Sequence, residues 1–170
     1  IRDLYGADPQ TSADYGRIVN TRHHDRLTSL LDGVRVDVGG GSDRESRYIQ
    51  PTVVNGVSPD HPLMRDEIFG PILPIVHVAH AQEAVQFIQR RDKPLALYLF
   101  STNRRVRRLF QTRTSSGGMA IGVPSAHLLA PQLPFGGVGE PGTGPYHGRA
   151  GFETVRLPRS APREPRPQSA

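Results

Sequence analysis

The sequence predicts an α/β protein whose strands run parallel. Three short segments, 72–79, 95–100 and 118–123, are apolar enough for buried strands. Between them, apolar residues at helical spacing predict helices over 81–88 and 103–112. Strands and helices that alternate with short connections form a parallel sheet with helices packed on it. We therefore expect a β-α-β-α-β core with right-handed crossovers.

Before this core, the chain has signals for one helix and two short extended segments. Asn20 is an N-cap candidate for a helix that we expect to run to about residue 32. Apolar and polar residues alternate over 34–38, as in a half-buried strand. Residues 48–54 predict another extended segment, and Pro51 within it argues against a central position in a sheet.

The C-terminal part of the sequence differs in composition from the rest. Beyond Pro124 the chain is rich in glycine and proline, which predicts loops. The tail over 156–170 holds four arginines, four prolines and a single large apolar residue. Such a segment cannot bury enough surface to offset its ordering entropy. We therefore expect one domain over residues 1–155 and a disordered basic tail over 156–170.

The positive charge of the chain gathers in that tail and on one predicted helix. The sequence has 21 Lys and Arg against 16 Asp and Glu, a formal net charge of +5. The second cluster lies on the 103–112 helix and consists of Arg104, Arg105, Arg107 and Arg108. It is either a solvated helix face or a phosphate-binding patch, and no nucleic-acid motif accompanies it. A nucleic-acid binder is therefore the weakest of the functional hypotheses.

Composition excludes several kinds of site from this sequence. Its 170 residues include no cysteine, so they offer no disulfide, thiolate metal site or cysteine nucleophile. The sequence has no apolar run near the roughly 20 residues that cross a bilayer and no signal-peptide pattern. We therefore expect a cytoplasmic chain without a membrane partner. Because it opens with Ile1 rather than methionine, we also expect a processed or truncated product.

Common catalytic and binding motifs are missing or out of context. The segment 137–142 satisfies G-x-G-x-x-G, but more glycine and proline follow where a dinucleotide-binding helix would have to begin. The seven histidines show no metal-ligand spacing, and no G-x-S-x-G is present. We expect neither a metal nor a serine nucleophile.

Residues 66–71, Asp-Glu-Ile-Phe-Gly-Pro, form the most informative segment. One interpretation is a surface turn with a phenylalanine anchor that leads into a strand. The other is nucleotide recognition, because a carboxylate can accept from both vicinal hydroxyls of a ribose and a phenyl face can pack on a planar ring. The residues alone leave both open.

Six segments, in order, resemble landmarks of the aldehyde dehydrogenase superfamily. Three resemble the family at large: E-I-F-G-P-I at 67–72, K-P-L-A-L-Y at 93–98 and L-P-F-G-G-V-G at 133–139. Three resemble its class 3 branch: R-Y-I-Q-P-T at 47–52, R-T-S-S-G-G at 113–118 and Y-H-G at 146–148. The likeness covers about residues 1–155. It implies that these residues are the C-terminal portion of an aldehyde dehydrogenase catalytic domain, which is incomplete here.

The resemblance implies an NAD(P)-dependent enzyme that oxidises an aldehyde to a carboxylic acid and that forms a homodimer when complete. Its catalytic cysteine and general-base glutamate would lie upstream of Ile1, so no catalytic residue is expected in this chain, and we expect the chain to be inactive alone. Glu67 would bind the nicotinamide ribose and Phe69 would pack beside the nicotinamide. The residues that would line the aldehyde pocket are Leu128, Leu129, Phe135 and His147.

For two of these residues a structural role stays open as an alternative. Phe135 would then be a core anchor beside glycines, and His147 would bond a nearby backbone group. One rival function for the whole chain also stays open. The chain would be a non-catalytic assembly module that associates with a full-length homologue, because a truncated domain presents unpaired strand edges.

Overall fold

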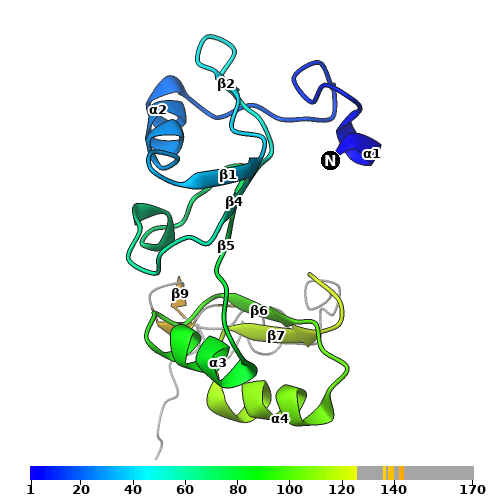
Figure 1. Cartoon of the computed structure of the whole chain (residues 1–170), viewed down its shortest axis with the longest axis vertical. Coiled ribbons are helices and arrows are strands. Elements are labelled where there is room, and N and C mark those ends of the chain that lie inside the picture. Colours follow the sequence, from blue (N-terminus) through cyan, green and yellow to red (C-terminus); the bar gives the residue numbers. More distant parts are fainter. Residues whose placement is uncertain (126–135, 137, 140–141, 144–170) are drawn as a thin grey trace, which may run out of the picture. The chain divides into compact units, whose positions relative to one another are not determined.

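The chain divides after residue 77 into two units with separate hydrophobic cores. The computed structural model describes residues 1–125, 136, 138–139 and 142–143. Unit 1 is Ile1–His77 and unit 2 is Val78–Ala170 (Figure 1). Each unit mixes helices with at least one parallel strand pair, which confirms the predicted α/β class. The predicted 156–170 tail lies outside the described residues.

Unit 1 is built on a three-stranded sheet in the order β1-β4-β5. Strand β1 (Arg35–Val38) runs antiparallel to β4 (Thr52–Asn55), and β4 runs parallel to β5 (Ile72–Ile75). The β4–β5 register starts at Thr52 opposite Ile72 and ends at Asn55 opposite Ile75. The short strands β2 (Ser42–Asp43) and β3 (Tyr48–Ile49) pair as an antiparallel hairpin.

Helix α2 (Thr21–Ser29) begins where the sequence predicts. The Asn20 side chain accepts a hydrogen bond from the backbone N–H of His23 at 2.8 Å and so satisfies an otherwise unpaired donor of the first turn. The helix ends earlier than expected, because the N–H of Leu31 bonds to the carbonyl of Thr28, three residues back. Two other short helices complete the unit: α1 (Arg2–Tyr5) and the 3₁₀ helix η1 (Pro62–Met64).

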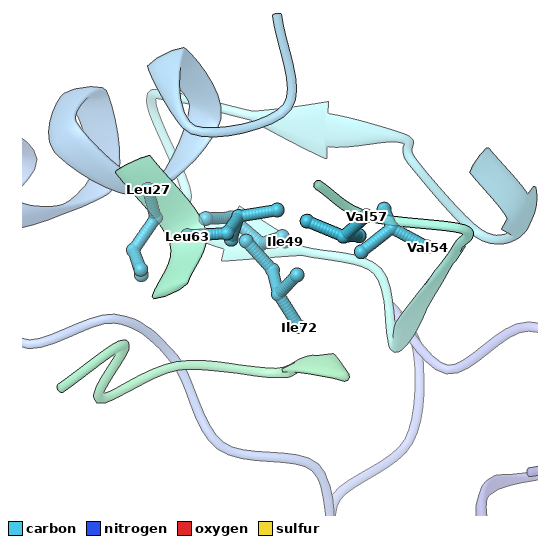
Figure 2. Packing of buried hydrophobic residues seen from close by; sticks show 6 residues of the cluster. All are labelled: Leu27, Ile49, Val54, Val57, Leu63 and Ile72. Atoms are coloured by element: carbon cyan, nitrogen blue, oxygen red, sulfur yellow. The ribbon is translucent and has the colours of Figure 1, made fainter. Parts of the chain in front are cut away.

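The core of unit 1 joins α2, η1 and the strands. Six buried apolar residues form it (Figure 2): Leu27, Ile49, Val54, Val57, Leu63 and Ile72. Alternation along β4 explains its share, since Thr52 and Val54 are buried while Val53 and Asn55 are half-buried. One face of the strand therefore faces the core.

In unit 2, helices α3 (Ala81–Gln89) and α4 (Arg104–Arg113) accompany the parallel pair β6 (Ala96–Leu99) and β7 (Gly118–Ile121). Leu97 and Leu99 are two residues apart on β6 and so share a face. Both pack with Val85 of α3 and Phe110 of α4, so the two helices cover the same side of the strand pair. The segment β6-α4-β7 is the predicted β-α-β arrangement.

The predicted strands do not all share one ladder. Strand β5 pairs with β4 in unit 1, whereas β6 pairs with β7 in unit 2. The 48–54 segment is also different from the prediction, because Pro51 separates β3 from β4 and β4 is the middle strand of its sheet. The expectation that this segment avoids a central position was therefore wrong. Pro51 lies outside both strands, so its missing N–H interrupts neither ladder.

The G-x-G-x-x-G segment overlaps a short strand pair. Val138–Gly139 (β8) pairs antiparallel with Gly142–Thr143 (β9). A dinucleotide fingerprint needs a strand, a turn and the start of a helix, so this pairing agrees with the rejection of that interpretation. Within the described residues, no helix is long and apolar enough to cross a membrane. The same part of the chain holds no group of three histidine or carboxylate side chains placed for a metal ion.

Candidate coenzyme-binding turn

Glu67 and Phe69 lie on the turn between η1 and β5 in unit 1. Both side chains are exposed, and 73% of the Phe69 surface is accessible. Within the described chain, the Glu67 carboxylate has no hydrogen-bond or ion-pair partner. Phe69 has a φ of 51°, in the left-handed region that bulky residues rarely adopt. The structure therefore presents an acidic and an aromatic side chain to solvent from a backbone in an unusual conformation.

Two side chains of α2 hold the backbone of this turn. Arg26 donates from its guanidinium to the carbonyls of Glu67 at 3.2 Å and Ile68 at 2.6 Å. The Nε2 of His23 lies 2.9 Å from the carbonyl oxygen of Phe69. Since a carbonyl can only accept, this nitrogen is the donor. Three consecutive carbonyls of the turn thus have partners on one helix.

Arg26 also sets the orientation of the His23 ring. Its Nε donates to His23 Nδ1 across a longer 3.4 Å. With Nδ1 accepting and Nε2 donating, the ring has the tautomer that the bond to Phe69 requires. The His23 ring also meets the Phe69 ring edge-on, with centroids 6.2 Å apart. The aromatic side chain is therefore contacted from the helix that binds its carbonyl.

Gly70 lets the turn approach α2 closely. A Cβ at this position would lie 2.5 Å from Cδ1 of Leu27, nearer than real contacts allow. His23, Arg26 and Leu27 are spaced i, i+3 and i+4, so they share one face of the helix. Residues 67–70 bond to this face through three carbonyls and pack against it at Gly70.

Two clefts meet at Phe69. One, of about 300 Å³, is mostly apolar and is lined by Tyr15, Ile18, Val19, Ile49 and Phe69 among others. The other, of about 540 Å³, is lined by Val19, Asn20, Arg22, His23, Arg26 and Phe69. Glu67 lines neither cleft. The structure thus places the Phe69 ring at a cleft and the Glu67 carboxylate at the exposed side of the same turn.

Helix α2 is itself anchored to the β2–β3 hairpin. The Asp25 carboxylate accepts from Arg44 Nε at 2.8 Å and from the guanidinium NH2 of the same residue at 2.9 Å. Hydrogen bonding to Arg44 lowers the pKa of Asp25 from its ordinary 3.8. The buried His24 ring adds a bond of 3.1 Å from Nε2 to the Tyr48 carbonyl. These contacts fix the helix that supports the turn.

Tyr15, which lines the apolar cleft, has a raised pKa. Burial, and then the neighbouring Tyr48 and Tyr5, raise the pKa of Tyr15 to about 12. Its hydroxyl donates to the Ile49 carbonyl at 2.8 Å. A phenol with this pKa stays protonated at neutral pH, so Tyr15 shapes the cleft and does not serve as a base there.

Four predicted site residues lie outside the described part of the chain: Leu128, Leu129, Phe135 and His147. Conversely, no sequence motif marks His23 or Arg26. The sequence indicates only the helix face on which they lie, since the Asn20 cap fixes the helix start and Leu27 marks its buried face. His23 and Arg26 are four and one residues before Leu27, on that same face.

Comparison with known proteins gives a consistent result. Residues 3–158 match the family model described as the aldehyde dehydrogenase family. The "Aldehyde dehydrogenase, dimeric NADP-preferring" of Rattus norvegicus is 49% identical over 160 residues, which are 94% of this chain and 35% of the rat protein. The Bos taurus protein of the same name is 48% identical, with 94% of this chain and 67% of that sequence covered.

Solved structures show the same likeness. A substrate-bound AldH of Staphylococcus aureus superposes with a TM-score of 0.88 at 45% identity, over 99% of this chain and 38% of that one. The indole-3-acetaldehyde dehydrogenase AldA of P. syringae, solved with NAD+, gives a TM-score of 0.74 at 25% identity, over 86% of this chain and 30% of that one. The chain therefore spans about a third of the length of most of these relatives.

Proposed function

This chain belongs to the aldehyde dehydrogenase family, and we propose that it supplies the nicotinamide-facing turn of an NAD(P)-dependent enzyme that oxidises aldehydes to carboxylic acids. One observation carries the proposal. Glu67 and Phe69 project freely from a turn whose backbone is bonded to α2. A binding element needs free side chains on a fixed backbone, because ordering the backbone during binding costs affinity.

The residues present fit a pyridine nucleotide. The unpartnered Glu67 carboxylate offers two acceptor oxygens, which suit the vicinal hydroxyls of a ribose. The exposed Phe69 ring offers an apolar face for a planar ring. When bound, the coenzyme would supply the hydride acceptor, and Glu67 and Phe69 would bind and orient it.

We further propose that the chain does not oxidise aldehydes alone. Its 170 residues contain no cysteine, so the thiolate that attacks an aldehyde in this family has no counterpart among them. Leu128, Leu129, Phe135 and His147 are proposed to face the aldehyde. A cytoplasmic homodimer completes the proposal for the whole enzyme, supported for its oligomeric state by the word "dimeric" in the names of the relatives.

Coenzyme binding by the chain tests the proposal. Calorimetry with NADP+ compares the unaltered protein with Glu67→Gln and with Asp66→Asn as a matched control on the neighbouring exposed carboxylate. Hydrogen bonds to a charged acceptor contribute about 1.5–3 kcal/mol each. We therefore expect Glu67→Gln to weaken binding by roughly tenfold or more, and Asp66→Asn to leave it unchanged.

An assay at 340 nm with NADP+ and a simple aldehyde tests the second half of the proposal. No NADPH is expected from the isolated chain. Equal weakening in both carboxylate variants would contradict the assignment of Glu67, and turnover by the chain would contradict its inactivity.

A further inference from the structure

We propose that His23 and Arg26 are positioning residues that hold the 67–70 turn in its coenzyme-binding conformation before the coenzyme arrives. The inference rests on the coenzyme role proposed above for Glu67 and Phe69. It assigns a function to two side chains of α2 that lie outside the motif. Neither residue needs to touch the reacting atoms for this role.

Side chains of α2, and not hydrogen bonds within its own backbone, fix the backbone of the turn. Within the described chain, no backbone–backbone hydrogen bond involves residues 66–70; those nearest are from Arg65 to Pro62 and from Thr52 to Pro71. The carbonyls of Glu67, Ile68 and Phe69 instead accept from Arg26 and His23. Removal of these side chains would leave the three carbonyls to water.

The backbone conformation at Phe69 needs such support. A φ of 51° is sparsely populated by aromatic residues, and a backbone in this region persists only when its surroundings determine it. His23 bonds the carbonyl of Phe69 and contacts its ring, while Leu27 abuts Gly70. One helix face therefore specifies the direction in which the Phe69 ring leaves the turn.

Positioning and direct ligand contact predict different results for Arg26. The Arg26 guanidinium donates to both carbonyls from one terminal nitrogen and to His23 Nδ1 from Nε, whereas the single ammonium of lysine cannot occupy both positions. If Arg26 acts on the turn, its loss changes the mobility of Phe69 without any coenzyme. If it only contacted a ligand, the free chain would be unaffected.

Backbone ¹⁵N relaxation of the full chain without coenzyme makes this distinction. We expect order parameters of about 0.85 at Phe69 and Gly70 in the unaltered protein and below about 0.6 in Arg26→Ala. Arg26→Lys should lie between them. Arg22→Ala removes an exposed guanidinium from the same helix and should match the unaltered protein. Unchanged order at Phe69 in Arg26→Ala would overturn the proposal.

The amide of Val54, in the core of unit 1, reports whether a variant remains folded. If its order parameter also falls in Arg26→Ala, the comparison passes to His23→Ala and His23→Gln. Glutamine keeps a side-chain N–H donor for the Phe69 carbonyl and alanine does not. Lower order at Phe69 in the alanine variant alone supports the proposal, and equal order in the two overturns it.

NADP+ calorimetry on the same proteins completes the test. The Arg26→Ala variant should bind NADP+ about tenfold more weakly than the unaltered chain, because it must order the turn on binding. Equal affinity despite a mobile turn would overturn the positioning role. If even the unaltered chain fails to bind NADP+, the proposed function fails, and the relaxation data still decide whether α2 fixes the turn.

Discussion

Helices α2 and α4 differ in how far along the sequence their arginines find a backbone partner. Helix α4 carries five arginines, of which Arg104, Arg105, Arg108 and Arg113 are exposed; the half-buried Arg107 donates to the Ser101 carbonyl at 2.6 Å. Helix α2 directs the half-buried Arg26 at two carbonyls more than 40 residues away in sequence. The helix with the most arginines in its sequence is therefore not the helix whose arginine bonds the 67–70 turn. A functional arginine is recognised by what its guanidinium bonds.

Gly117 of unit 2 and Gly70 of unit 1 differ in the atoms that lie against them, and this gives the largest expected effect. At Gly117 in unit 2 an added Cβ would collide with the carbonyl oxygen of Gly136 and lie 2.7 Å from that of Leu95, both backbone atoms. At Gly70 in unit 1 it would meet only the end of the Leu27 side chain. A side chain can rotate away more easily than backbone can move.

We expect Gly117→Ala to destabilise unit 2 by about 3 kcal/mol and Gly70→Ala to destabilise unit 1 by about 1 kcal/mol, the two ends of the range for overpacking. Urea unfolding followed separately through unit 1 and unit 2 amides measures both. Gly122→Ala is a control for backbone strain alone. An added Cβ there would meet nothing within 4 Å, but the φ of Gly122 is 81°. A larger loss at Gly70 than at Gly117 would contradict this ranking.

The next largest loss of stability is expected when either of the two asparagine N-caps is replaced. These replacements test whether α2 and α4 depend equally on the capping of their first turn. Asn20 caps α2 and Asn103 caps α4, the latter by accepting from the N–H of Arg105 at 2.9 Å. Asn→Ala at either cap should cost about 1 kcal/mol. The Asn20→Ala variant should also increase mobility at Phe69, because His23 is in the capped turn.

Chemical unfolding and amide relaxation on both variants measure these effects. Asn103→Ala is the matched control for the second readout, since α4 belongs to unit 2 and the turn to unit 1. Increased Phe69 mobility in both variants would show that the effect is not specific to α2.

The smallest expected effect is the pH dependence of the Asp25–Arg44 contact that anchors α2. Because the folded pKa of Asp25 lies below its unfolded value of 3.8, this contact stabilises the fold above pH 3.8. That stabilisation is lost as pH falls through the lowered folded pKa.

Thermal melts of the unaltered protein and Asp25→Asn should therefore differ slightly at pH 7 and converge as the pH falls below 3.8. Asp32→Asn, an exposed carboxylate for which the described chain shows no ion pair, should give no such convergence. A difference between the unaltered protein and Asp25→Asn that grows toward low pH would contradict the sign of the shift.

Local sequence signals predicted much of the secondary structure. The Asn20 cap marks the start of α2, the helix predicted over 103–112 matches α4 within one residue at each end, and apolar spacing locates the buried face of α3 at Val85. These elements depend on interactions between residues within about four positions of one another, so their signals are present in short windows. The strand over 72–79 is shorter than predicted and ends at Ile75.

Strand pairing was less accessible from the sequence. The order β1-β4-β5 and the separate β6–β7 pair involve partners that are distant in sequence. The pattern of apolar residues in a strand shows which face is buried but does not indicate which strand pairs with it. Pro51 was misinterpreted for the same reason. The effect of this proline depends on whether its nitrogen, which carries no hydrogen, lies where a strand ladder needs a donor. Only the fold decides that position.

By itself, the sequence determined the family, the Glu67–Phe69 motif and the helices that follow Asn20 and Asn103. Only the tertiary structure decided that His23 and Arg26 bond the backbone of that motif, because their bonds to Phe69, Glu67 and Ile68 span 46, 41 and 42 residues. A hydrogen bond requires two atoms about 3 Å apart in a fixed direction. Folding creates that proximity, and no spacing along the chain encodes it.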